Sequence, residues 1–275
     1  MSPSLIDTHT HVNFQAYRED ADEVVERALA EGTWMINAGT QFETSRRAVE
    51  MAENYSDGVY AAVALHPIHL FAHHVDDDEV SFNAHGEEFN IETYRELVQR
   101  SAKVVAIGEF GLDYYRMPPG EDPMNVRKVQ REVLEQHLLL SKQVDKPVMI
   151  HCRDAYTELA EILKHNYSGT GDIHCFVGTW EEAKPFLEMG YYIGLNGIIT
   201  FDKTGRSEEV VKNLPLESIL LETDAPYLSP VPMRGKRNEP SYVKHVAQKI
   251  AEIKGIDVQA VEEATTANAR KLFRI

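Results

Sequence analysis

Six histidine and acidic residues lie, one by one, where short apolar runs of the sequence end. The runs read LIDTHTH, VVAIGEFGLD, PVMIHCR, GDIHCF and ILLETDAP, and each is followed by a turn or a helix. Imidazole and carboxylate groups are common protein ligands of divalent metals. Ligands spread over almost the whole chain meet only in a fold that gathers its strand ends, as a (β/α)₈ barrel does. The six residues are His9, His11, Glu109, His151, His174 and Asp224.

The number of these residues indicates two metal ions, because a catalytic zinc takes only three protein ligands. Strand side chains alternate, so His9 and His11 face the same side. The first and eighth strands of a closed barrel are neighbours, as are the fifth and sixth. The inward-facing Asp7 and Glu222 either orient the ligands or belong to the barrel floor. The expected grouping is His9, His11 and Asp224 at one ion, His151 and His174 at the other, and Glu109 as the bridge.

Strand patterns alternate with helix patterns through residue 224, which favours a parallel sheet. The length and the eight strands predict one α/β domain over residues 1–275, a (β/α)₈ TIM barrel with the metal site at the C-terminal ends of its strands. The expected strands are Leu5–His9, Thr33–Ala38, Val59–Leu65, Val104–Glu109, Pro147–His151, Asp172–Cys175, Tyr191–Leu195 and Ile219–Asp224. The expected helices are Glu19–Glu31, Phe42–Asn54, Glu92–Ser101, Met124–Val144, Ala155–Asn166, Thr179–Met189, Arg206–Asn213, Ser241–Lys254 and Val258–Leu272.

One segment interrupts this alternation. Residues 67–91 form a long connection after the third strand and carry four histidines and an acidic run, Asp76-Asp77-Asp78-Glu79. We interpret the segment as a solvated surface excursion. A substrate-contacting lid and a third metal site are the alternatives. The histidines are His69, His73, His74 and His85.

Composition limits the compartment and the partners. No apolar stretch reaches the ~18 residues of a membrane span, and the N-terminus lacks a signal-peptide pattern, so we expect a cytoplasmic protein with no membrane partner. The formal net charge of −16 argues against broad electrostatic binding to duplex nucleic acid, but bound cations can reverse the field inside one cleft. Cys152 and Cys175 each follow a proposed ligand, so alternation should turn both thiols away from the site, as small buried groups.

The successive motifs of the chain resemble those of the TatD-type metal-dependent deoxyribonucleases, within the amidohydrolase-like barrel superfamily. The motifs, from about residue 5 to 273, are DTHTHVNF, LHP, AIGEFGLDYY, PVMIHCRDA, IHCFVGTWEEA, GYYIGLNGIITF, LLETDAPYLSPVPMRGKRNEPSYV and ATTANARKLF. The resemblance implies a distorted (β/α)₈ barrel and hydrolysis of DNA phosphodiester bonds with divalent metal. It implies the same six ligands, and that His66 faces the substrate. Thr10, Val12 and Asn13 depart from the family's first motif, and the connection after Pro67 is longer than usual.

Positive charge for phosphate binding is concentrated after the eighth strand. The loop PMRGKRNEP contains the densest basic cluster of this acidic chain, and another arginine follows His151 by two residues. Arginine and lysine are the usual phosphate-positioning side chains of nucleases. The candidate phosphate ligands are Arg153, Arg234, Lys236 and Arg237.

These features predict a two-metal deoxyribonuclease that trims single-stranded DNA ends, in which Asp224 binds metal and accepts a proton while Glu109 bridges the ions. Mg²⁺ or Mn²⁺ should support activity, whereas Zn²⁺, Ni²⁺ or Co²⁺ also suit imidazole ligands. The alternative is an amidohydrolase-type enzyme that cleaves a small cyclic amide, lactone or ester. Such enzymes often bridge their metals with a modified lysine on the fourth strand, where this chain has Glu109. A barrel retained only for binding predicts lost ligands, and all six are present.

Overall fold

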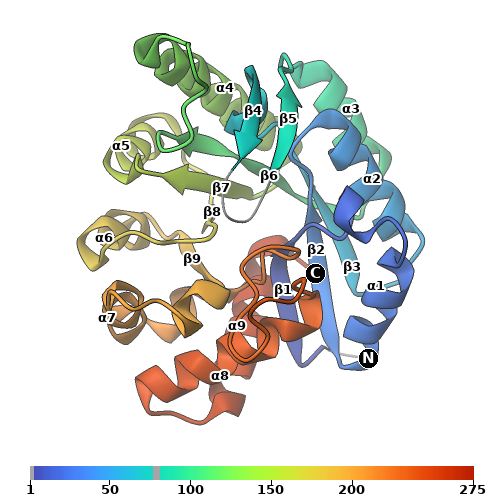
Figure 1. Cartoon of the computed structure of the whole chain (residues 1–275), viewed down its shortest axis with the longest axis vertical. Helices are drawn as coiled ribbons and strands as arrows, with labels where there is room; N and C mark the ends of the chain where they lie inside the picture. The colour runs from blue at the N-terminus through green and yellow to red at the C-terminus, as the bar shows by residue number, and fades with distance from the viewer. Residues whose placement is uncertain (1–2, 77–80) are drawn as a thin grey trace.

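The structure is a computed structural model that describes residues 3–76 and 81–275. Eight parallel strands form one sheet in the order β1-β2-β3-β6-β7-β8-β9-β10. They curve into a barrel whose helices lie outside it (Figure 1), so the predicted distorted (β/α)₈ barrel is confirmed. The strands are β1 (Leu5–Thr10), β2 (Thr33–Ala38), β3 (Val59–Val63), β6 (Val104–Asp113), β7 (Val148–Arg153), β8 (Gly171–Ile173), β9 (Tyr192–Leu195) and β10 (Ile219–Leu221).

The barrel closes between β1 and the end of β10 without a regular ladder. Thr10 and Ala225 form a single parallel bridge. The Asp224 amide donates to the His9 carbonyl at 2.9 Å. Deeper in the barrel, the buried Asp7 carboxylate accepts from the amide and hydroxyl of Thr223 at 2.8 and 2.6 Å. The seam is therefore held partly by side chains, and it places Asp224 beside β1.

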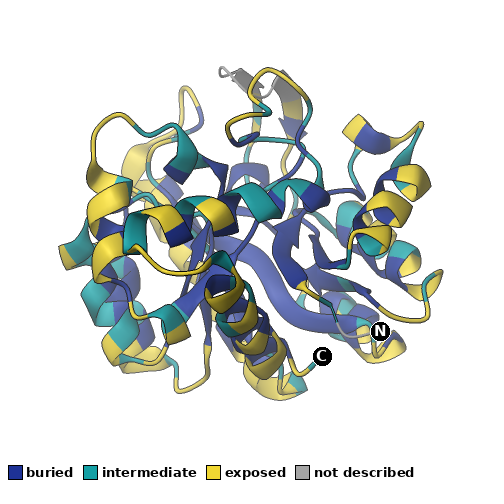
Figure 2. Ribbon diagram, turned by 90° about the horizontal axis from the view of Figure 1, so that it is seen from below, coloured by how far each residue is buried: buried dark blue, intermediate teal, exposed yellow. Residues whose placement is uncertain are grey.

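Helices cover the outside of the barrel, and their outward faces are exposed while the strands are buried (Figure 2). No helix in the described ranges is long and apolar enough to cross a bilayer. The helices are α1 (Ala21–Ala30), α2 (Phe42–Glu53), α3 (Ile91–Arg100), α4 (Pro123–Val144), α5 (Tyr156–Asn166), α6 (Trp180–Glu188), α7 (Arg206–Asn213), α8 (Val243–Lys254) and α9 (Val258–Phe273). Short 3₁₀ turns are η1 (Gln15–Tyr17), η2 (Pro67–His69), η3 (Gly197–Thr200), η4 (Leu216–Ser218) and η5 (Pro240–Tyr242).

Two apolar clusters support the site. The larger one lies between the strands and the surrounding helices and includes Ile107 and Leu134. The smaller one gathers strand residues such as Ile36 and Met149 with Phe273 from the end of α9. Burial of this much apolar surface, at roughly 25 cal/mol per Å², fixes the strands and hence their ends.

The long connection after β3 contains a β-hairpin that the sequence did not predict. Antiparallel strands β4 (Ala72–Asp76) and β5 (Ser81–His85) pair along their length. Ahead of them Ile68 and His69 are buried, as is Ala84 on β5. The expectation of a solvated excursion is therefore wrong for these residues. Backbone pairing in a hairpin requires no apolar run, so its polar sequence resembled a loop; Asp77, Asp78 and Glu79 lie outside the described residues.

Candidate metal centre

The structure brings all six candidate ligands to one place at the C-terminal mouth of the barrel. The carboxylate of Glu109 lies in the middle. Its Oε2 is 3.3 Å from Nε2 of His9 and 3.8 Å from Nε2 of His11. Its Oε1 is 3.0 Å from Nδ1 of His151 and 3.6 Å from Nε2 of His174. Oε1 also has Nε2 of His66 at 3.4 Å. The two oxygens therefore face different sets of imidazoles, the arrangement expected of a carboxylate that bridges two cations.

Asp224 completes the side of the site occupied by β1. Its Oδ1 lies 3.3 Å from Nε2 of His11 and 4.0 Å from Nε2 of both His9 and His174. Its side chain is 14% exposed, against 6% for Glu109. Of the two carboxylates among the six candidate ligands, Asp224 is thus the more open to the pocket.

Glu109 owes its orientation to an irregularity in β6. Between Ile107 and Phe110, β6 has one more residue than β7 has between their partners Val148 and Ile150, which makes a β-bulge. Such bulges change the direction in which side chains point. After the bulge, the backbone of Gly111 lies close to that of His151 on β7. Only glycine fits there, because a Cβ would lie 1.8 Å from the carbonyl oxygen of His151.

Fixed acceptors determine which nitrogen of the β1 imidazoles faces the site. Nδ1 of His11 lies 2.9 Å from the carbonyl oxygen of Ala38, and Nδ1 of His9 lies 3.0 Å from Sδ of Met149. A carbonyl can only accept, so Nδ1 of His11 carries the proton; the thioether favours the same tautomer for His9. In both rings, Nε2 then presents its lone pair to Glu109.

The other two imidazoles are held by carboxylates. Nδ1 of His174 donates to Oε2 of Glu222 at 3.0 Å, which leaves Nε2 for the site. Nε2 of His151 donates to Oδ2 of Asp113 at 3.1 Å, which leaves Nδ1 for the site. A carboxylate behind a histidine commonly orients metal-binding imidazoles. The donor set therefore fits divalent cations.

The closest contact in the cluster also fits cations. Nε2 of His9 and Nε2 of His11 are 3.1 Å apart. If both rings keep their protons on Nδ1, two lone pairs face each other across this distance. A shared positive ion removes that repulsion. Groups whose ligand atoms lie within 4.8 Å of one another include His9 with His11 and Glu109, and His9 with His174 and Asp224.

Electrostatics at the site favour positive charge. Burial alone lowers the pKa of His174, but the carboxylates of Glu222 and Glu109 outweigh it and raise that pKa to about 10. Burial would raise the pKa of Glu109, yet His66, His9 and His174 hold it well below its ordinary value. Both carboxylates of the cluster are therefore ionised, because the pKa of Asp224 is also lowered, against burial, by the nearby imidazoles of His11 and His174.

Unlike the four histidine ligand candidates, His66 turns an N–H rather than a lone pair toward the site. Its Nδ1 accepts a hydrogen bond from the Ile68 amide at 3.1 Å, so the proton of the neutral ring is on Nε2. Burial lowers the pKa of His66, which favours that neutral ring. Nε2 lies 3.4 Å from Oε1 of Glu109. His66 is thus set to donate a hydrogen bond into the site, as a substrate-facing residue requires.

Sequence reasoning missed Asp113, although a signal was present. It lies four residues after Glu109 on the same strand, hence on the same face by alternation. Sequence reasoning did name Glu222 and Asp7, and the structure gives them different roles. Glu222 holds His174, whereas Asp7 accepts from the backbone amide of His9 and from Thr223 in the barrel seam.

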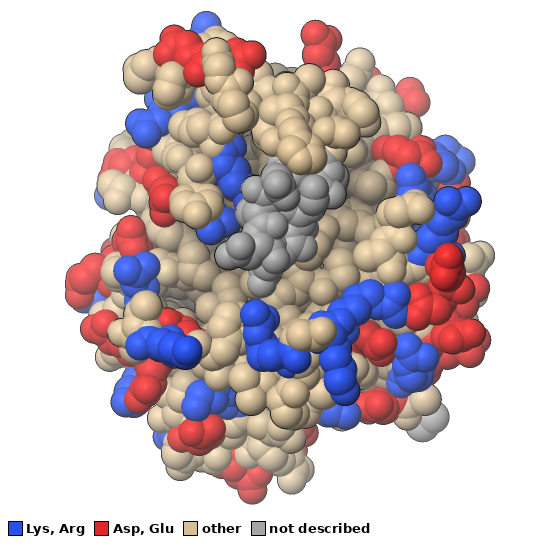
Figure 3. Space-filling view, in the orientation of Figure 1, with Lys and Arg blue, Asp and Glu red and all other residues tan. Residues whose placement is uncertain are grey.

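A pocket of about 460 Å³ opens above the cluster. Phe14, Tyr115, Phe201 and Tyr227 contribute aromatic side chains to its wall. His66 and Arg153 line it as predicted candidates, and Arg116 lines it without having been predicted. Lysine and arginine atoms flank the middle of this molecular face, while most acidic atoms lie toward its edge (Figure 3).

The basic loop after β10 lies outside the wall of this pocket. Arg234 stacks over the Phe201 ring, with 4.0 Å from its guanidinium carbon to the ring centre, and is exposed like Lys236. Arg237 instead pairs with Asp20 and covers the ring of buried Tyr17 at 4.3 Å. Phosphate binding stays a prediction for Arg234 and Lys236, whereas Arg237 has structural partners that occupy its guanidinium.

The prediction for the two cysteines is correct for one and wrong for the other. Cys152 is buried in the apolar core, although it also borders the pocket. Cys175 lies beyond the last residue of β8, has a φ of 47° and lines the pocket. Strand alternation no longer applies there, so its Sγ lies within 4.8 Å of ligand atoms of His174 and Glu222.

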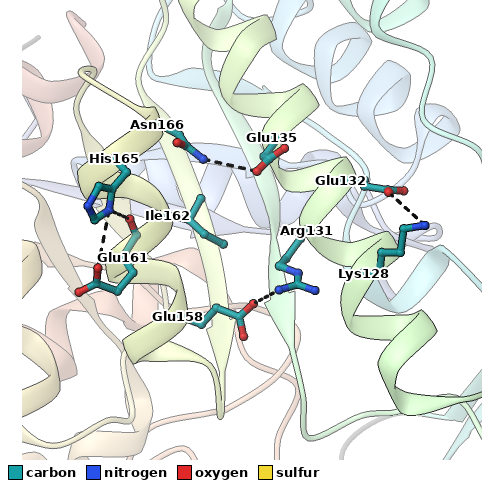
Figure 4. A pocket seen from close by; sticks show the side chains of 9 residues that line it. All are labelled: Lys128, Arg131, Glu132, Glu135, Glu158, Glu161, Ile162, His165 and Asn166. Carbon is teal, nitrogen blue, oxygen red and sulfur yellow. Dashed lines mark hydrogen bonds and ion pairs between the residues drawn. The ribbon is translucent and has the colours of Figure 1, made fainter.

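A second hollow, of about 450 Å³, lies between α4 and α5 and contains none of the six candidate ligands (Figure 4). Its charges largely pair with each other. Arg131 lies 3.2 Å from Glu158, and Lys128 lies 3.7 Å from Glu132. The barrel mouth is therefore the better candidate for chemistry.

Comparison with known proteins agrees with this geometry. The family model described as TatD related DNase matches residues 6–274. An uncharacterised metal-dependent hydrolase of Bacillus subtilis strain 168, YabD, is 40% identical, covering 98% of this chain and 99% of its own. The TatD of Citrobacter rodentium, named a 3′-5′ ssDNA/RNA exonuclease, is 33% identical, covering 98% of both chains. The crystal structure of the TatD homologue YjjV from Escherichia coli K12 covers 100% of both chains with a TM-score of 0.85 at 32% identity. This chain therefore belongs to the TatD family of metal-dependent hydrolases.

Proposed function

We propose that the protein is an exonuclease that hydrolyses phosphodiester bonds at single-stranded DNA ends with the help of two divalent metal ions. The observation that carries the proposal is the division of the Glu109 carboxylate, with Oε2 facing the two β1 imidazoles and Oε1 facing those of His151 and His174. Family membership supports hydrolysis, and the name of the Citrobacter relative supports a nucleic-acid end as the substrate.

Residues of this chain supply the remaining parts of the reaction. Two bound divalent cations would polarise the phosphate and lower the pKa of the attacking water. Asp224, the more exposed carboxylate, lies where it can take the proton of that water. His66 presents an N–H to an oxygen of the phosphate. Arg116 and Arg153 bring positive charge to the pocket wall.

The size of the pocket at the barrel mouth supports an end of a strand rather than duplex DNA. A pocket of about 460 Å³ is within the size range of small-molecule sites. One terminal nucleotide, unpaired, can enter such a pocket more readily than an intact helix. Mg²⁺ or Mn²⁺ remains our proposal for the working metal, and two free thiols fit the cytoplasm that the sequence predicts.

The test is a metal reconstitution assay on labelled oligonucleotides. Enzyme stripped by a chelator should release no nucleotide, and Mg²⁺ or Mn²⁺ should restore stepwise shortening of a single strand from one end. A lactone and a cyclic amide form the comparison arm. Hydrolysis of those substrates without any nucleotide release would replace the proposal by the amidohydrolase alternative. Full nucleotide release by demonstrably metal-free enzyme would refute the two-metal mechanism.

A further inference from the structure

Tyr115 is an exposed aromatic residue in the wall of the pocket. Its side chain is 59% exposed, which places it among the few large apolar groups on the described surface. Single exposed aromatics need no explanation in general. This one differs because the Arg153 guanidinium lies against one face of its ring, 3.8 Å from the ring centre.

The ring is also fixed relative to the metal centre. The Tyr115 amide donates to Oδ1 of Asp113 at 3.0 Å. The other oxygen of Asp113 accepts from His151, whose Nδ1 lies 3.0 Å from Glu109. The neighbouring Tyr114 amide donates to the Arg153 carbonyl at 2.9 Å. One continuous series of polar contacts therefore connects the loop that bears the ring with the Glu109 carboxylate.

We propose that Tyr115 is the stacking platform for the base of the terminal nucleotide, an inference that rests on the proposed function. A flat ring backed by a guanidinium offers one open π-face and a cation close to it. Aromatic side chains bind single-stranded nucleic acid in this way without sequence preference, because every base has a π-face. Arg153 then has two contacts to offer, the ring of Tyr115 and the nearby phosphate.

The platform gives a physical reason for the choice of single strands. A base inside a duplex is already stacked and paired, so reaching Tyr115 would first cost its unpairing. An unpaired terminal base loses only its flexibility. The stacking contact is indifferent to the 2′-hydroxyl, so the same platform serves DNA and RNA ends.

The experiment is a double-mutant cycle, in which the Tyr115 ring and the terminal base of the substrate are changed singly and together. Two single strands are compared that differ only in the terminal base, thymine or 5,6-dihydrothymine. The saturated ring keeps the hydrogen-bonding groups of thymine but loses planarity. On the thymine strand, Tyr115→Ala should lower kcat/KM by about 5- to 150-fold, chiefly through KM. Tyr115→Phe should keep most of the wild-type value.

On the dihydrothymine strand, wild type and Tyr115→Ala should be nearly equal. Equal losses for Tyr115→Ala on both strands would overturn the proposal, because the ring would then act through something other than the base. Arg153→Lys tests the contribution of the guanidinium behind the Tyr115 ring, since lysine keeps the charge but cannot stack on the ring. The proposal predicts a partial loss of kcat/KM on the thymine strand and a smaller loss on the dihydrothymine strand.

Two controls separate this inference from the proposed function. Tyr60 stacks with Lys103 at 5.1 Å at the start of β3, away from the barrel mouth, so Tyr60→Ala should leave the thymine preference unchanged. If wild type shortens single strands but shows no thymine preference, only the stacking platform is refuted. If wild type hydrolyses no nucleic acid with any metal, the proposed function itself fails.

Discussion

Oδ2 of Asp113 lies 3.1 Å from Nε2 of His151, and this contact joins the candidate metal centre to the pocket-lining loop of Tyr115 and Arg116. Oδ1 of the same carboxylate accepts from the amides of Tyr115 and Arg116 at 3.0 and 2.7 Å. Burial would raise the pKa of Asp113, but its hydrogen bond with His151 outweighs burial and holds that pKa below its ordinary value. The ionised Asp113 therefore orients a ligand imidazole and a pocket wall together.

The first prediction is that Asp113→Asn weakens metal binding while the barrel stays folded. The amide can no longer accept from His151 as a carboxylate does, so the ring turns more freely and is a weaker base. Partners of this kind are typically worth about 10–100-fold in metal affinity. Calorimetric metal titration of the stripped enzyme measures the change. Asp202→Asn is the matched control, because Asp202 also accepts from backbone amides but contacts none of the candidate ligands. Equal affinities for wild type and Asp113→Asn would contradict the prediction.

The second prediction concerns the central carboxylate. Glu109→Ala should cut hydrolysis by orders of magnitude with little change in folding, because both metal positions lose their shared ligand. Metal content should fall in the same preparation. Circular dichroism checks the fold, and mass spectrometry under native conditions counts the ions. An unaltered rate would show that Glu109 binds no metal.

The third prediction separates two roles of Asp224. Asp224→Asn keeps one oxygen that can bind metal but loses the charge and the ability to take a proton. If Asp224 does both, the variant keeps a substantial share of its metal while single-turnover cleavage falls by about 10²–10⁴-fold or more. Both quantities are measured on one preparation. A metal-loaded variant that cleaves at the wild-type rate would assign the proton to another group.

The meeting of the six candidate ligands could be predicted because alternation and barrel topology are local or general rules. His9 and His11 share a face by spacing alone, and the eight strand segments fixed the end at which they meet. Other features depend on contacts that no spacing rule contains. Arg237 pairs with Asp20, which lies 217 residues away in sequence. Cys175 turns into the pocket because β8 ends two residues earlier, a boundary that its apolar pattern did not mark.

The fourth prediction divides the basic loop into two functions. Arg234→Ala and Lys236→Ala should each lower the log–log salt slope of single-strand binding by roughly 0.7 to 1, as expected for a lost phosphate contact. Arg237→Ala should leave that slope unchanged but lower the melting temperature, because Asp20 and the Tyr17 ring lose their partner. Binding isotherms at several salt concentrations and thermal melts provide both readings. A smaller slope for Arg237→Ala would instead make it a phosphate ligand.

The last prediction concerns a buried histidine outside the metal centre. His137 on α4 accepts from the Leu65 amide at 3.1 Å, and its ring lies between Phe110, with centroids 4.5 Å apart, and Phe89, at 3.8 Å. Burial lowers its pKa from 6.5 to about 3. The unfolded chain therefore binds a proton below pH 6.5 that the folded protein does not bind until about pH 3.

It follows that the stability contributed by neutral His137 is fully present above pH 6.5 and is lost progressively as the pH falls toward 3. In chelator, the free energy of unfolding of the wild type should fall between pH 6.5 and 4 with a slope that includes about 1.4 kcal/mol per pH unit from this proton. His137→Gln can still accept from Leu65 but cannot titrate. In denaturation experiments, the free energy of unfolding of His137→Gln should therefore depend on pH less steeply than that of the wild type, by up to that amount. This holds whatever the stability of the variant at pH 7. Parallel slopes for the two proteins would mean that His137 is protonated in the fold or that another buried group controls acid unfolding.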